Sequence, residues 1–114
     1  LQGSFPHGAA LHLGHAGGNA DDHAGAGEHA YKENQEFIVA LSGSFDVVLD
    51  DSINKLVYPL NRSYKGLYVA KGIWRKMTNF STNSLALVLS STDYDVNDYI
   101  MDYQDFKKWI AKQK

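Results

Sequence analysis

The 114-residue sequence contains no cysteine, only two prolines and no continuous apolar run of about 18 residues. Without cysteine, disulfides and thiolate metal sites are excluded. Without a long apolar run no membrane-spanning helix is expected, and the first residues lack the basic and then apolar order of a signal peptide. The net charge of -2 gives no electrostatic case for binding nucleic acid or an anionic membrane. We therefore expect a soluble, cytoplasmic, single-domain protein with neither of these partners.

The composition changes sharply near residue 28. Residues 1–28 hold seven of the ten glycines and four of the five histidines, with few large apolar side chains. Such a segment has little surface to bury and much backbone entropy to lose on folding. We predict that residues 1–27 are irregular, with at most a short extended piece over residues 9–13. The domain itself is predicted over residues 28–114.

Short apolar runs separated by turn signals follow from residue 28 onward. This pattern is typical of a β-sandwich or β-barrel. Near the end the apolar period changes to that of a helix, with Phe106, Trp109 and Ile110 on one face. We predict a helix over residues 103–112, packed on the outside of the sheet. The predicted strands cover residues 36–41, 45–49, 55–58 (stopped by Pro59), 66–70, 74–80 and 84–90.

Two spaced motifs carry the candidate chemistry. The first places His29, Tyr31, Glu36 and Gly43 in the spacing of a His-x-His pair followed by Glu and Gly. The second motif contains Gly72, Arg75 and Asn79. Together they resemble the two metal motifs of the cupins, with Tyr31 and Arg75 at positions where those motifs have histidine. The spacing therefore favours a cupin-type barrel whose pocket works without a metal.

In a strand, residues two apart point to the same face, so His29 and Tyr31 are predicted to project together into the barrel. Glu36 and Arg75 would join them from neighbouring strands. A neutral imidazole can take a proton from carbon beside a carbonyl, and a phenol can hydrogen-bond the oxyanion that forms. Arg75 cannot ligate a metal, but it can hold a phosphate or carboxylate, or pair with Glu36. A purely structural ion pair is the alternative.

Three further features of the sequence bear on what the protein can bind. Trp74 beside Arg75 forms an aromatic and cationic pair that can hold a nucleotide, although aromatic residues also simply pack in sheets. The acidic segment over residues 93–99 lacks the central Gly and final Glu of a calcium loop, so a solvated loop is expected. The spacing of the five histidines fits no zinc pattern. We therefore expect no metal and no cofactor. The histidines are His7, His12, His15, His23 and His29.

From about residue 28 to residue 110 the chain resembles the sugar 3,4-ketoisomerase family, also called WxcM-like. The resemblance implies a metal-independent cupin jelly roll that forms a homodimer, often by exchanging N-terminal strands. It also implies isomerisation of a dTDP-4-keto-6-deoxyhexose to its 3-keto isomer through an enediol, for surface polysaccharides such as lipopolysaccharide. The matching text includes residues 27–32, 35–49, 60–64, 66–68, Trp74 and Arg75, 79–81, 91–95 and 98–100.

On this resemblance His29 is the candidate base and Tyr31 its catalytic partner. The candidates for substrate contact are Lys32, Glu36, Trp74 and Arg75.

The chain departs from the family pattern at three places. Tyr31 stands where the family has a second His, Ala26 stands where it has Arg, and residues 1–27 lack the expected strand-rich text. An altered isomerase, an isomerase for another sugar, a metal-dependent cupin enzyme and a non-catalytic nucleotide-sugar binding module of a polysaccharide cluster all stay open. A shifted reading frame would explain residues 1–27 and is tested by translating the gene in its other frames.

Overall fold

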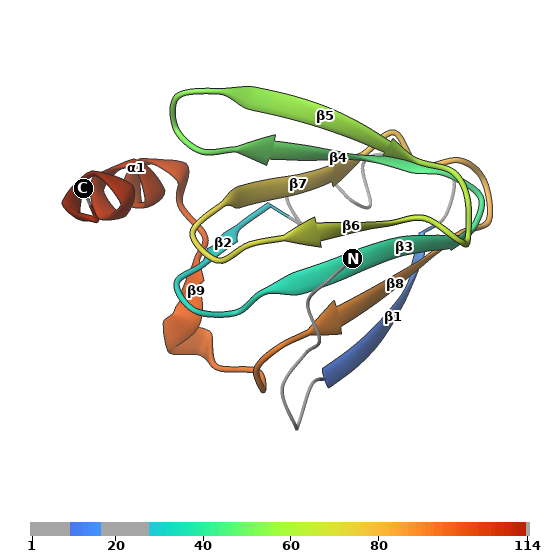
Figure 1. The fold of residues 1–114 in the computed structure, drawn as a ribbon, viewed down its shortest axis with the longest axis horizontal. Helices are drawn as coiled ribbons and strands as arrows, with labels where there is room; N and C mark the ends of the chain where they lie inside the picture. The colour runs from blue at the N-terminus through green and yellow to red at the C-terminus, as the bar shows by residue number, and fades with distance from the viewer. Residues whose placement is uncertain (1–9, 17–27, 114) are drawn as a thin grey trace.

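The computed structural model describes residues 10–16 and 28–113 (Figure 1). Strands dominate these residues, and one α-helix follows them near the C-terminus. The elements in chain order are β1 (Ala10–Ala16), β2 (Ala30–Tyr31), β3 (Glu36–Ser42), β4 (Phe45–Asp50), β5 (Lys55–Leu60), β6 (Gly66–Val69), β7 (Trp74–Thr78), β8 (Ser84–Ser90), the 3₁₀ helix η2 (Val96–Asp98), β9 (Tyr99–Ile100) and α1 (Tyr103–Lys112).

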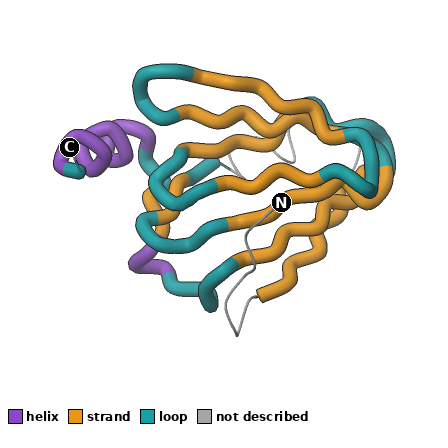
Figure 2. Tube along the Cα trace, in the orientation of Figure 1, coloured by secondary structure: helices purple, strands orange, loops and turns teal. Residues whose placement is uncertain are grey.

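The strands form two main sheets that face each other as a sandwich and do not close into a barrel (Figure 2). One sheet has the order β1-β8-β3-β6 and the other has the order β5-β4-β7. The two-residue strand β2 extends the second sheet, because an antiparallel bridge joins His29 to Arg75 of β7. The resulting orders 1-8-3-6 and 2-7-4-5 are those of a jelly roll with two Greek keys. The predicted all-β jelly roll with a C-terminal helix is confirmed.

Side chains from both sheets fill the space between them. Alternate residues of β3 and β4 point inward, so Ile38 and Ala40 meet Phe45 and Val47 across the sandwich. The buried core is completed from other strands by Leu60, Val69 and Ala86.

Two strand predictions need correction. Residues 10–16 form β1, although at most a short extended piece was expected there; its backbone pairs along β8 from Ser84 to Ser90. A long run of ladder hydrogen bonds on that open edge offsets the entropy of ordering the segment. Pro59 lies inside β5, because β5 is an edge strand and needs hydrogen bonds on one side only. The rest of the segment predicted to be irregular lies outside the described residues.

Helix α1 confirms the prediction for residues 103–112. It begins where Asp102 caps it, accepting hydrogen bonds from the backbone N–H groups of Gln104 and Asp105. Phe106 is fully buried and forms a second core with Ala30, Trp74 and Ile100. In Figure 1 the helix lies at one end of the sandwich, and over the described residues no helix has the length and apolarity to cross a bilayer.

The two motif glycines are explained by backbone geometry. Gly43 has φ +69° and Gly72 has φ +76°, in the left-handed region that side chains disfavour. A Cβ at Gly43 would also lie 2.9 Å from the Cα of Ser84. Each glycine makes a turn beside a strand that contributes to the cavity described next.

Candidate active site

A cavity of about 210 Å³ opens between the two sheets. It brings together the four residues predicted from the two motifs, His29, Tyr31, Glu36 and Arg75, so this juxtaposition is confirmed. They arrive from both sheets, and apolar side chains fill the wall between them. The remaining lining residues are Ile38, Met77, Val88 and Tyr99.

The short β2 segment is fixed by its backbone. The N–H of His29 donates to the carbonyl of Arg75 at 3.0 Å, and the N–H of Arg75 donates to the carbonyl of His29 at 2.8 Å. The imidazole and the Tyr31 ring meet edge to face, with centroids 4.7 Å apart. The predicted shared face of His29 and Tyr31 therefore exists, and it points into the cavity.

Glu36 and Arg75 form an ion pair across the sandwich. Arg75 Nη1 donates to Glu36 Oε1 at 2.5 Å, and the two residues are 1% and 5% exposed, with Arg75 the more buried. A second guanidinium nitrogen donates to the carbonyl of Ile73 at 3.1 Å. Since β3 and β7 belong to different sheets, this pair ties the two layers together. The structure therefore shows the ion pair with Glu36 that was predicted as one possible role of Arg75.

The Tyr31 phenol lies among these charged groups. The guanidinium carbon of Arg75 is 4.9 Å from its ring centroid, and its hydroxyl donates to the Tyr99 hydroxyl at 3.1 Å. Burial raises the pKa of Tyr31 far above its usual value; the Glu36 carboxylate and the hydrogen bond to Tyr99 add to this effect. Tyr31 is therefore a protonated donor throughout the neutral range, not a base.

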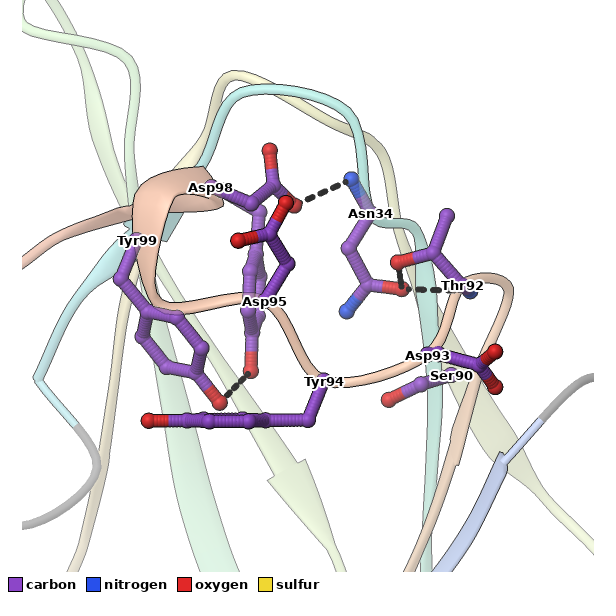
Figure 3. Close-up of a pocket in the computed structure, with 9 residues that line it drawn as sticks. Asn34, Ser90, Thr92, Asp93, Tyr94, Asp95, Asp98 and Tyr99 are labelled. Atoms are coloured by element: carbon purple, nitrogen blue, oxygen red, sulfur yellow. Dashed lines mark hydrogen bonds between the residues drawn. The ribbon is translucent and has the colours of Figure 1, made fainter.

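Tyr99 is a lining residue that sequence analysis did not single out. It lies on β9 directly opposite Tyr31 in the β2–β9 pair. The centroid of its ring lies 4.7 Å from the centroid of the Tyr31 ring and 5.4 Å from that of the Tyr94 ring. Figure 3 shows the Tyr94 ring next to Tyr99. Neither motif includes this position, because strand pairing across 68 residues of sequence brings the two hydroxyls together.

The acidic loop that precedes β9 is a structural clamp. Asp98 accepts hydrogen bonds from the backbone N–H groups of Glu33 at 2.8 Å and Asn34 at 3.0 Å. The buried side-chain carbonyl of Asn34 accepts from the N–H and the hydroxyl of Thr92, both at 3.1 Å (Figure 3). These bonds fix the loop against the β2–β3 connection and thereby set the position of Tyr99.

Two predicted contact residues do not reach this cavity. Trp74 precedes Arg75 on β7 and so points to the opposite face, where it is 5% exposed and packs against Phe106 and Tyr103. Lys32 is exposed and lines a separate open pocket with Glu33 and the acidic loop. The structure therefore does not bring Trp74 and Arg75 together as a nucleotide clamp.

The donor set of the cavity does not suit a metal ion. His29 and Glu36 are its only imidazole and carboxylate among the described residues, and Glu36 already neutralises Arg75. The described part of the chain contains no group of three His, Cys, Asp or Glu side chains placed to hold a metal. A guanidinium in the wall also repels a cation.

A jelly roll with an internal cavity, in which Tyr and Arg occupy positions of cupin metal ligands, defines a cupin-like protein. The family described as WxcM-like, C-terminal matches residues 19–111. The chain belongs to this family.

Named relatives agree with this assignment. A TDP-4-oxo-6-deoxy-alpha-D-glucose-3,4-oxoisomerase of Aneurinibacillus thermoaerophilus is 42% identical over 86 residues, which cover 75% of this chain and 62% of that protein. The chain thus spans less than two thirds of that relative. A 3,4-ketoisomerase structure from Helicobacter canadensis is 33% identical, with TM-score 0.81 over 90% of this chain and 74% of that chain.

A further similar structure is a double mutant of a 3,4-ketoisomerase from Thermoanaerobacterium thermosaccharolyticum in complex with TDP. It is 25% identical, with TM-score 0.81 over 91% of this chain and 73% of that chain.

The ion pair generates the first prediction. Replacing either Glu36 or Arg75 by Met leaves the other charge buried without a partner, which costs about 3–5 kcal/mol of unfolding free energy. Replacing both removes the two charges together, so the double variant is expected to recover most of that loss. Urea unfolding of the four proteins measures this. A double variant less stable than both single variants would contradict the account.

The raised pKa of Tyr31 generates the second prediction. A tyrosine with a higher pKa in the native than in the unfolded state stabilises the fold below the unfolded value, about 10, and loses that contribution at higher pH. Between about pH 9 and pH 11 the free energy of unfolding of Tyr31→Phe should therefore fall less than that of the wild type. Denaturant unfolding across this range measures how steeply the unfolding free energy of each protein falls with pH.

The matched control for this pH experiment is Tyr64→Phe, which removes the hydroxyl of a ring that is 76% exposed. Its stability should follow the wild-type pH dependence. Equal slopes for Tyr31→Phe and the wild type would show that Tyr31 ionises alike in the native and unfolded states.

Proposed function

We propose that this protein is a metal-independent isomerase that converts a dTDP-4-keto-6-deoxyhexose to its 3-keto isomer through an enediol. The single observation that supports this most is the shared cavity wall of His29 and Tyr31, an imidazole beside a protonated phenol. The named activities of the relatives and the TDP bound to one of them support the same substrate class. The reaction needs no cofactor, because it moves only protons and one double bond.

In this proposal His29 removes the proton from sugar C3, while Tyr31 keeps its proton and donates a hydrogen bond to the oxygen at C4, where negative charge develops. The C3–C4 double bond forms as the C4 carbonyl bond opens, which gives the enediol as its anion. The proton of the C3 hydroxyl then passes to the neighbouring oxygen at C4, and His29 returns its proton to C4. The second half therefore regenerates neutral His29 and leaves the carbonyl at C3.

The other predicted contact residues take different parts. Arg75 and Glu36 line the cavity as a neutral pair, so their proposed part is to fix the shape and polarity of the wall around the sugar. Trp74 acts indirectly, since it holds β7 against the helix α1. Lys32 stays a prediction for substrate contact, since it lines the separate open pocket beside Glu33.

The second candidate is a non-catalytic module that binds a nucleotide sugar. Tyr31 favours it, because burial keeps this phenol protonated in the neutral range, so it cannot accept a proton as a second histidine would. Under either function we place the protein in the cytoplasmic synthesis of sugars for surface polysaccharides. The two candidates differ in one measurable property, which is exchange of carbon-bound hydrogen with solvent.

We also propose a homodimer, supported by the sheet β1-β8-β3-β6. Its inner face is apolar, yet the half-buried side chains of Phe37, Leu87 and Leu89 make the outer face apolar as well, because β3 pairs with β8 in this register. A sheet that is apolar on both faces normally has both faces covered. A second copy of the chain is the proposed cover, with or without exchange of β1.

The isomerase is tested in deuterated water with dTDP-4-keto-6-deoxyglucose. NMR should show a 3-keto product with deuterium at C3 or C4, and His29→Asn should lower the rate by about 10²–10⁴-fold because the base is lost. The control Ile53→Ala, at a residue 71% exposed on the β4–β5 turn, should match the wild type. Tight dTDP binding without deuterium exchange would instead favour the accessory module.

The dimer is tested by light scattering coupled to gel filtration. The wild type should elute at the mass of two chains, and Leu87→Glu should shift it to one chain by placing a charge in the contact. Ile53→Glu adds the same charge on the β4–β5 turn and should remain dimeric. A wild-type protein that is monomeric at micromolar concentration would refute the interface.

A further inference from the structure

The Tyr31–Tyr99 pair lies between two cavities. Both rings line the 210 Å³ cavity, and both also line a neighbouring cavity of about 10 Å³, together with Asn34, Asp95 and Asp98. The smaller space matches about one water molecule and is rich in polar atoms (Figure 3). The two hydroxyls thus join a space large enough for a sugar to a small polar one.

Packing fixes the position of Tyr99 closely. Its backbone pairs with Tyr31, the adjacent Asp98 is held by two backbone N–H groups, and the Tyr94 ring lies against its ring. The hydroxyl of Tyr99 therefore stays 3.1 Å from that of Tyr31 without further ordering. Such pre-ordering is what an efficient hydrogen-bonding site needs.

A hydroxyl group can donate one hydrogen bond and accept others. In the structure Tyr31 donates to Tyr99, so the Tyr31 hydrogen points away from any ligand. To donate to a ligand oxygen, Tyr31 must rotate its O–H and give up this bond. Tyr99 can then donate to Tyr31, which restores the contact in the opposite direction.

We propose that Tyr99 is a positioning residue that reverses its hydrogen bond with Tyr31 when a keto sugar binds, so that both hydroxyls donate in series toward the ligand oxygen. The inference rests on the proposed function and deepens it. Hydrogen bonds in series polarise one another, which strengthens the one that reaches the developing oxyanion. A water molecule in the smaller cavity would hydrogen-bond Tyr99 in both arrangements.

A double-mutant cycle tests the pair. Tyr31→Phe, Tyr99→Phe and the double variant are compared with the wild type in kcat and KM for dTDP-4-keto-6-deoxyglucose. Tyr99→Phe should lower kcat by about tenfold and leave KM within about twofold, since the bond gains strength in the transition state. The double variant should be no slower than Tyr31→Phe, because Tyr99 acts only through that hydroxyl.

The matched control is Tyr94→Phe, which removes a neighbouring hydroxyl from the same ring cluster and should stay within about twofold of the wild type. Thermal unfolding of each variant confirms that the Phe substitutions keep the packing. An unchanged kcat for Tyr99→Phe, or rate losses that multiply in the double variant, would overturn the inference and leave the isomerase proposal standing.

A wild-type protein without turnover would instead refute the proposed isomerase. The same cycle is then measured on the dissociation constant of this keto sugar. If the double variant loses no more affinity than Tyr31→Phe, the hydrogen-bonded pair is upheld as a unit that positions the ligand. If the affinity losses of the two single variants multiply in the double variant, or if none of the four proteins binds the sugar, the inference is overturned.

Discussion

The architecture depends on one buried ion pair between the two sheets. Glu36 of β3 and Arg75 of β7 face each other inside the sandwich, where neither charge is solvated. A buried pair adds little net stability, but it strongly penalises any register that separates its members. It therefore fixes the alignment of the layers, and with it the side chains that line the cavity.

The same pair determines which chemistry the cavity supports. The Arg75 guanidinium occupies the position of a histidine in the cupin motif, and the Glu36 carboxylate neutralises its charge in the cavity wall. The His29 imidazole and the Tyr31 phenol then face a space between the layers, beside this neutral pair. The acidic loop contributes no charge to this wall, since Asp98 is engaged by backbone N–H groups and only positions Tyr99.

The sequence predicted those parts of the structure that depend on local pattern. The short apolar runs such as that of β8 and the helical period of Phe106, Trp109 and Ile110 predicted a β-sandwich or barrel with its helix, and the two motifs identified four residues that meet in the cavity. β1 was missed because its order comes from pairing with a distant strand edge. Tyr99 was missed for the same reason. The predicted pair of Trp74 and Arg75 did not allow for the alternation of a strand, which sends two adjacent side chains to opposite faces.

The two residues of β2 have an unusual set of neighbours. The strand has too few residues to hold itself, so its position comes from the bridge to β7 on one side and from β9 on the other. Both supports come after position 70, and the second, β9, follows every strand of the two main sheets. A ribosome must therefore have synthesised the chain through β9 before the imidazole and phenol can settle into place, so this wall of the cavity cannot form before the strands of both main sheets have been made.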